Sequence, residues 1–336
     1  MDNRVLAVLL VLAASVQAPK TPRLIVKNQQ PPPPITSLKG STPTIVDVAV
    51  TNDRTLILEN ETNSLFVVSS DGRVLTRTNN IGVGTAMLAD PIQMLLARSN
   101  ELWVLDADEP KIASFAVRDG AIAYSSAVKL KGLSDVTGMC RLADKTLVLG
   151  KTSPPNTSKL LHVVSADGAV VLSIGESFGP PEEFARLFYG SGMLACLPAE
   201  RLAVVGSRYS PTVRAFDERG TLRWTVDLPD YRAVSYKEST PGRYTYIYPS
   251  DEVWDSLVGL FQPAPGVVAF QVGRRRGRDA SKASLEVRTQ LHDAATGRLV
   301  GTQTDLPVVK AVAGNRLLAS AGKGLQNFLT FAVEER

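Results

Sequence analysis

The sequence predicts an all-β fold, a six-bladed β-propeller with four-stranded blades. Short apolar strands that end in a glycine turn recur along the chain, at Gly72, Gly120, Gly168, Gly220 and Gly297. The first four turns are separated by 48, 48 and 52 residues, and the fifth follows after a longer interval. Six hairpins of matching pattern also align along the chain, and no convincing amphipathic helix separates them. Repeats of this length, built from short strands, are typical of propellers with one blade per repeat.

Each predicted blade has the same order of strands. A first strand runs through a short polar turn into a second strand, and a third strand reaches the glycine turn from which the fourth leaves. Apolar runs bounded by Asn, Asp, Gly and Pro support β-strands throughout. The six blades are expected at Thr44–Asn79, Pro91–Val128, Asp135–Ile174, Ser191–Leu228, Asp255–Leu306 and Val308–Glu334.

The sixth predicted blade has only three strands of its own. Upstream, Arg23–Lys27 (RLIVK) has no other assignment, so we expect this N-terminal strand to close the last blade as its outer strand. Such a closure would cover an open sheet edge and hold down a terminus. The chain then divides into a leader (1–18), a proline-rich linker with the closing strand (19–43) and the propeller (44–336).

The leader resembles a secretory signal. Arg4 precedes the apolar run Val5–Ala14, and small residues follow up to Ala18. The run is shorter than the roughly 20 residues that span a bilayer. We therefore expect a periplasmic or extracellular protein whose leader is either cleaved or kept as a membrane tether, the alternative being an incidental apolar start.

Composition weighs against several classes of function. A net charge of +4, dispersed along the chain, gives no indication of nucleic-acid binding, and two His with two Cys leave little material for a zinc site. Cys140 and Cys196 each lie five residues before a second strand, so equivalent positions on neighbouring inner strands are expected. We expect two buried thiols, with a disulfide as the alternative, because such positions lie near the limit of disulfide geometry.

A catalytic site in a propeller would gather polar groups at the central channel. Asp47, Gln93, Thr137 and Asp255 lie in or near the predicted inner strands, where carboxylate and amide oxygens could hold calcium. The other inner strands offer no matching Asn or Glu, so we expect these side chains to satisfy backbone groups instead. The two histidines lie in different blades and no motif places a nucleophile, so we expect no cofactor.

The segment between the fourth and fifth blades, Asp230–Asp255, is the best candidate for binding. Tyrosine offers a large, rigid contact surface, and the alternation in YTYIY places Tyr244, Tyr246 and Tyr248 on one face of a short strand. We interpret the segment as an aromatic platform for a protein partner or a glycan, the alternative being an insertion that packs its tyrosines onto the propeller rim. The expected platform comprises Tyr231, Tyr236, Tyr244, Tyr246, Tyr248 and Trp254.

A run of arginines is the second candidate contact. The sequence GRRRGR at 273–278 is expected in the hairpin between the second and third strands of the fifth blade. Guanidinium groups there could contact lipid headgroups or an acidic partner, and a solvated hairpin tip is the alternative. The residues concerned are Arg274, Arg275, Arg276 and Arg278.

The fourth predicted blade combines a glycine-containing lead-in, Glu176–Phe184 (ESFGPPEEF), with a turn that contains Phe216, Asp217 and Gly220. In this combination the blade resembles an NHL-type repeat. As architecture, residues 40 to 334 resemble the NHL-like extracytoplasmic six-bladed propellers of bacteria, although only the fourth blade matches the motif closely. The resemblance implies a binding or scaffolding protein more often than an enzyme, and it implies no catalytic residues.

The sequence therefore favours an extracytoplasmic binding or scaffolding module over an enzyme. One version is an accessory subunit of a membrane protein complex, which the leader, the proline spacer and the arginines would hold in place. The alternative is a metal-dependent hydrolase or lactonase acting at the channel mouth. Calcium in the channel would favour the enzyme, and an exposed tyrosine patch would favour the binding module.

Overall fold

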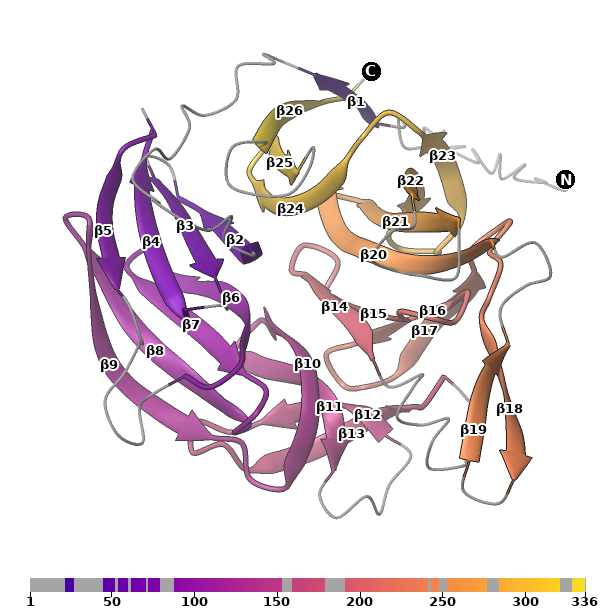
Figure 1. Ribbon diagram of the computed structural model, residues 1–336, viewed down its shortest axis with the longest axis horizontal. Helices are drawn as coiled ribbons and strands as arrows, with labels where there is room; N and C mark the ends of the chain where they lie inside the picture. Colours follow the sequence, from indigo (N-terminus) through magenta and orange to yellow (C-terminus); the bar gives the residue numbers. More distant parts are fainter. Residues whose placement is uncertain are drawn as a thin grey trace, which may run out of the picture.

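The computed structural model is an all-β propeller of six sheets around a central axis (Figure 1), which confirms the predicted fold class. The structure describes residues 22–26, 45–51, 54–59, 62–70, 72–78, 88–152, 159–178, 191–240, 243–247, 253–276, 284–320 and 328–335. The predicted leader and the four consecutive prolines lie outside these residues. Within the described ranges no helix is long and apolar enough to cross a membrane.

Each blade is an antiparallel sheet whose strands pair in chain order. Blade 1 comprises β2 (Ile45–Val50), β3 (Arg54–Glu59), β4 (Ser64–Ser69) and β5 (Val74–Thr78), and blade 2 comprises β6 (Pro91–Arg98), β7 (Glu101–Asp106), β8 (Lys111–Arg118) and β9 (Ala121–Lys129). Blade 3 comprises β10 (Leu133–Leu142), β11 (Lys145–Thr152), β12 (Lys159–Val164) and β13 (Val170–Glu176), and blade 4 comprises β14 (Gly192–Leu197), β15 (Leu202–Ser207), β16 (Thr212–Asp217) and β17 (Leu222–Asp227).

Two sheets follow an insertion in the second half of the chain. The insertion itself forms a two-stranded sheet, β18 (Ser235–Thr240) and β19 (Arg243–Ile247). Blade 5 comprises β20 (Val253–Ala264), β21 (Val267–Arg276), β22 (Ser284–Asp293) and β23 (Leu299–Gln303), and blade 6 comprises β24 (Val308–Ala313), β25 (Arg316–Ser320) and β26 (Phe328–Glu335). Strand β1 (Pro22–Val26) runs antiparallel to β26, with Pro22 opposite Glu335, but that this strand closes the propeller stays a prediction.

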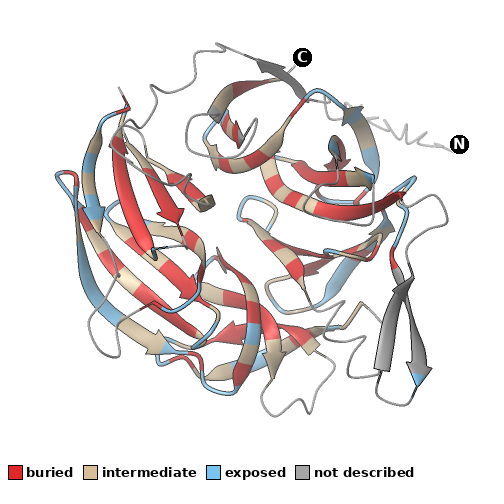
Figure 2. Ribbon diagram, viewed as in Figure 1, coloured by how far each residue is buried: buried red, intermediate tan, exposed pale blue. Residues whose placement is uncertain are grey.

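The hydrophobic core lies between the blades. Each of six apolar clusters joins two neighbouring sheets, and the cluster between blades 6 and 1 completes the ring by packing Ala311 and Leu318 against Ile57 and Phe66. Figure 2 shows burial concentrated on the second and third strands of the blades, and exposure on the outer, fourth strands. A blade therefore gains its stability from its neighbours rather than alone.

The glycine turns that define the repeat have a shared backbone geometry. All five glycines have a positive φ, between 73° and 84°, at the turn from the third strand to the fourth. An L-residue with a side chain rarely adopts such an angle, whereas glycine does so without steric cost. At Gly168 a side chain would also collide with a neighbouring blade, because a Cβ there would lie 2.0 Å from the carbonyl oxygen of Lys129.

A disulfide joins blades 3 and 4. Cys140 on β10 and Cys196 on β14 are bonded, with their Cα atoms 5.7 Å apart, which corrects the expectation of two buried thiols. Inner strands of neighbouring blades converge on the axis, so equivalent positions come within disulfide geometry.

The connections divide the ring into two different faces. Turns from first to second strand, and from third to fourth, lie at one face, which we call the short-turn face. Turns from second to third strand and the links between blades lie at the other, the long-connection face. Every connection longer than five residues joins strand ends at the long-connection face, namely 27–44, 79–90, 153–158, 177–191, 228–252, 277–283 and 321–327. Long connections on a rigid scaffold are the usual place for binding residues.

Candidate functional site

A central cavity of about 1420 Å³ opens at the long-connection face. All six blades line it, mainly through the beginnings of their first strands and the ends of their second strands. Its charged groups are segregated around the ring. Blades 1 to 3 contribute the acidic side chains Asp47, Asp90, Asp108 and Asp135, and blades 3 to 6 contribute the basic side chains Lys151, Arg208, Arg275 and Lys310.

The inner-strand polar residues bind backbone groups of the next blade. The carboxylate of Asp47 accepts hydrogen bonds from the N–H of Met94 at 2.6 Å and from that of Val48 at 2.9 Å. Gln93 repeats the arrangement one blade on, where its Oε1 accepts from the N–H of Met139 at 2.5 Å. The expectation that these residues satisfy backbone groups is confirmed for Asp47 and Gln93. Burial raises the pKa of Asp47 to about 7.

Gln271 is a third link of this kind, and the sequence analysis missed it. It lies on β21, the second strand of blade 5, yet its Oε1 accepts a hydrogen bond from the N–H of Val309 in blade 6 at 2.7 Å. The side chain occupies the space beside Gly259, where a Cβ would lie 2.6 Å from that Oε1 atom. A glycine on the inner strand opposite a glutamine is the sequence signal that could have revealed it.

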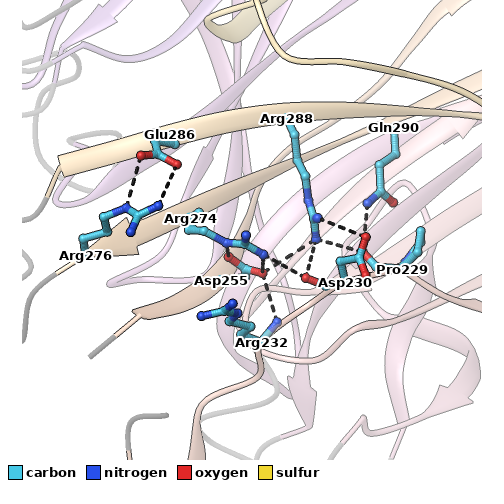
Figure 3. A network of polar contacts seen from close by, with 9 residues as sticks. All are labelled: Pro229, Asp230, Arg232, Asp255, Arg274, Arg276, Glu286, Arg288 and Gln290. Atoms are coloured by element: carbon cyan, nitrogen blue, oxygen red, sulfur yellow. Dashed lines mark hydrogen bonds and ion pairs between the residues drawn. The ribbon is translucent and has the colours of Figure 1, made fainter. Parts of the chain in front are cut away.

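The calcium site considered from the sequence is not assembled by the described residues. Within those ranges no group of three or more His, Cys, Asp or Glu is arranged to hold a metal ion. Thr137 lines the cavity, and its hydroxyl has no hydrogen-bond partner within the described ranges. Asp255 instead belongs to a network of charged groups at the base of the β18–β19 insertion (Figure 3).

Asp255 is completely buried, and both of its carboxylate oxygens are occupied. Arg274 donates from Nε to Oδ1 at 3.0 Å and from Nη2 to Oδ2 at 3.0 Å. The backbone N–H of Arg232 also donates to Oδ2 at 2.9 Å, and the N–H of Asp255 donates back to the carbonyl of Arg232 at 2.9 Å. Since Arg232 precedes β18 and Asp255 follows β19, these bonds tie the two ends of the insertion together.

Arg288 and Gln290 on β22 hold the chain on the entry side of the insertion. Arg288 Nη2 donates to the carbonyl oxygens of Pro229 at 2.8 Å and Asp230 at 2.7 Å, and Gln290 Nε2 donates to Pro229 at 3.2 Å. Burial lowers the pKa of Arg288, which the nearby carboxylate of Asp255 partly offsets. We call Asp255, Arg274, Arg288 and Gln290 the insertion clamp.

The insertion lies at the edge of the ring, outside the six blade sheets (Figure 1). Its register places Tyr236 opposite Tyr246, and Tyr244 lies two positions before Tyr246 on the same strand. Residues that face each other across a pair, or alternate along one strand, share a face. Positions 236, 244 and 246 therefore fall on one face of the hairpin, and Tyr248 lies outside the described residues.

Two of the expected platform residues lie at the base of the insertion instead. Tyr231 is partly buried, and its hydroxyl donates to the carbonyl of Arg208 at 2.7 Å. Trp254 is only 6% exposed, with the guanidinium of Arg275 5.4 Å from its ring centroid and the ring of Tyr209 at 6.3 Å. Their contacts differ from the exposed platform that the sequence suggested, because they pack against blades 4 and 5.

The arginine run also differs from its expected position. Arg274, Arg275 and Arg276 lie within β21, and the hairpin connection begins only after them, with Arg278 outside the described residues. Strand pairing with β20 and β22 continues through the run, in which Arg274 is held by Asp255 and the exposed Arg276 pairs with Glu286 at 3.1 Å. Arg274, Arg275 and Arg276 therefore belong to a strand of blade 5 and not to the hairpin connection.

Comparison with known proteins identifies the fold alone. No family model and no curated protein matches the chain, so the NHL-type resemblance of the fourth blade has no matching family. Among solved structures, the chain is similar to a member of the DUF4221 family from Bacteroides vulgatus, with a TM-score of 0.59, 9% identity, and coverage of 95% of this chain and 100% of that one. It is also similar to a putative exported protein from Bacteroides fragilis, with a TM-score of 0.54, 10% identity, and coverage of 94% of this chain and 95% of that one.

Proposed function

We propose that this protein is an extracytoplasmic binding module, and that a protein partner docks on the β18–β19 hairpin. The observation that carries the proposal is the insertion clamp, a buried set of charged groups that fixes both ends of a tyrosine-bearing hairpin at the edge of a rigid ring. A two-stranded hairpin is marginally stable alone. Because the clamp orders its base before any partner arrives, less conformational entropy is lost on binding.

The register of the hairpin supports a tyrosine surface. Positions 236, 244 and 246 share one face, and tyrosine is enriched at binding hot spots because it buries a large amphipathic area at low entropic cost. A glycan is the alternative ligand for the same face, since sugars also stack on aromatic rings. The remaining arginine of the run, Arg278, is proposed as a secondary contact with an acidic partner or with lipid headgroups.

Several features support a location outside the cytoplasm. Disulfides persist in oxidising compartments, and Cys140 and Cys196 form one. The leader-like N-terminus and the fold shared with a putative exported protein point the same way. We propose that the leader, whether cleaved or kept as a tether, delivers the propeller to the periplasm or the cell exterior, where it serves as an accessory subunit of a membrane complex. In this proposal β1 closes blade 6.

The test is purification from native membranes in mild detergent, followed by mass spectrometry of what co-purifies. We expect a stoichiometric partner with the wild-type protein and its loss when Tyr236, Tyr244 and Tyr246 are all replaced by Ser. A matched control changes the other face of the same hairpin, with Lys237→Ser and Thr245→Ala, which lie opposite each other in the register. The control should keep the partner.

Retention of the partner by the triple tyrosine variant would overturn the proposed docking surface. A lone soluble protein that carries stoichiometric calcium would instead favour the alternative, a metal-dependent hydrolase or lactonase at the channel mouth. The N-terminal peptide, read in the same experiment, shows whether residues before Ala18 are retained.

A further inference from the structure

Two cationic side chains line the central cavity without forming an ion pair with any described carboxylate. Arg208 follows β15 in blade 4 and is exposed, and Lys310 lies on the inner strand β24 of blade 6. In the described part of the chain, neither forms an ion pair or a side-chain hydrogen bond. The two charges also act on each other: burial lowers the pKa of Lys310, and the field of Arg208 lowers it further.

The carboxyl group nearest Lys310 is already engaged. Asp47 attracts Lys310, but its two oxygens accept the backbone hydrogen bonds from Met94 and Val48. Its raised pKa means that near neutral pH it carries only part of a negative charge. Lys310 and Arg208 therefore leave a net positive field on the side of the cavity that blades 4 to 6 form.

A buried serine also lines the cavity. Ser256 on β20 is 2% exposed, and its Oγ has no hydrogen-bond partner among the described residues. A buried polar group that lacks a partner costs about 1 to 3 kcal/mol, so native proteins rarely leave one unsatisfied. The side chains of Met193, Leu257 and Val309 supply apolar wall on the same side.

We propose that the cavity binds a small organic anion, whose carboxylate or phosphate group lies between Lys310 and Arg208 and accepts a hydrogen bond from Ser256. The cavity, at about 1420 Å³, exceeds the usual 300 to 1,000 Å³ of ligand pockets, so there is room for a carbon skeleton beside the charged group. The opposite side carries Asp90, Asp108 and Asp135, of which Asp135 pairs with Lys151 at 3.1 Å, and the remaining negative charge repels a second anionic group. The ligand class is therefore a molecule with one anionic end.

The experiment is calorimetric titration of the purified protein with acetate and, separately, with inorganic phosphate, at constant ionic strength. We expect saturable binding of at least one anion. Binding of acetate indicates a carboxylate site, and binding of inorganic phosphate indicates a phosphate site. Lys310→Gln and Arg208→Gln should each weaken binding about tenfold, since each removes a charged hydrogen-bond donor. Ser256→Ala should weaken it about threefold. The matched control is Arg118→Gln, an exposed arginine at the end of β8 on the short-turn face, which should bind as wild type.

Absence of saturable binding of both anions would overturn the proposal. So would wild-type affinity in both Lys310→Gln and Arg208→Gln, or equal weakening in Arg118→Gln, which would indicate a diffuse charge effect. Thermal unfolding checks that each variant is folded, and Lys310→Met replaces Lys310→Gln if the latter is not. The titration needs no protein partner, so its failure does not affect the proposed docking surface. Loss of the docking surface, in turn, does not affect the proposed anion site.

Discussion

At the scale of single residues, buried polar side chains in this propeller serve mainly to join one element to another. Asp47, Gln93 and Gln271 each accept a backbone hydrogen bond from the next blade. Asp255 accepts a hydrogen bond from the backbone N–H of Arg232 and so joins the two ends of the insertion. Buried carboxylates are tolerated here because each has donors for its oxygens, and the loss of those donors is what makes such positions sensitive to substitution.

Replacement of the clamp carboxylate should strongly destabilise the fold. Asp255→Ala leaves Arg274 without its anionic partner and the half-buried Arg288 with Asp230 alone, and a broken buried pair costs about 3 to 5 kcal/mol. Urea denaturation measures the free energy of unfolding. Asp305→Ala, at an exposed position between blades 5 and 6, is the control and should change it little. A loss below about 1 kcal/mol in Asp255→Ala would contradict the clamp.

Asp47 should make stability depend on pH. Burial raises its pKa from 3.8 to about 7, so between these values the folded state binds a proton that the unfolded chain releases. Stability from this group is therefore fully present below about pH 4 and is lost as the pH rises through about 7.

The variant Asp47→Asn tests this, because it keeps an acceptor oxygen for Met94 and removes the titration. As the pH rises, the free energy of unfolding of the wild type should fall, relative to that of Asp47→Asn, by on the order of 1 to 3 kcal/mol. Solvent in the cavity screens part of the effect of the Asp47 charge. Urea unfolding of both proteins at several pH values measures the difference. Parallel pH profiles would show that Asp47 has an ordinary pKa.

At the scale of elements, the sequence predicts strands and turns well and their side-chain contacts poorly. Glycine turns could be recognised because a positive φ demands glycine at every repeat, as at Gly72 and Gly297. The arginine run was placed in a hairpin tip because its anchor, Asp255, lies 19 residues earlier, and pairing at that separation leaves no local signal. The disulfide was only the alternative expectation, because the sequence places Cys140 and Cys196 at equivalent positions on neighbouring inner strands but does not show how closely those strands converge.

The candidate site could be predicted in part. The Asp230–Asp255 segment was recognised from its tyrosine content, and the structure shows it as a separate two-stranded sheet. Its mode of attachment could not be foreseen, because Arg288 and Gln290 come from a strand of blade 5 more than fifty residues later. The cavity cations gave no sequence signal either, since Arg208 and Lys310 are about 100 residues apart and meet only when the ring forms.

At the scale of the whole molecule, the ring has one face built for stability and one available for function. Short turns with glycine close one face, and the cavity and the insertion both lie at the other. Six interblade cores distribute the stability around the ring, and the core between blades 6 and 1 joins the last blade to the first. This makes the pairing of β1 with β26 a sensitive place to test closure.

Removal of β1 should lower the thermal stability of the ring. We expect a protein that begins at Asn28 to unfold at a temperature at least about 2 °C below that of a protein that begins at Pro19, because β26 would lose its antiparallel partner and leave an open edge. A protein that begins at Thr21 keeps β1 and is the control. Equal midpoints in scanning calorimetry for all three would show that β1 does not close the propeller.

The central claim, that a protein partner docks on the tyrosine face of the hairpin, is tested most directly by site-specific photo-crosslinking in the native host. A photoreactive benzoylphenylalanine replaces Tyr246 in one strain and Thr245, on the opposite face, in another. We expect one discrete crosslinked partner from position 246 and none from position 245. No product at position 246, or the same product from both positions, would contradict the claim.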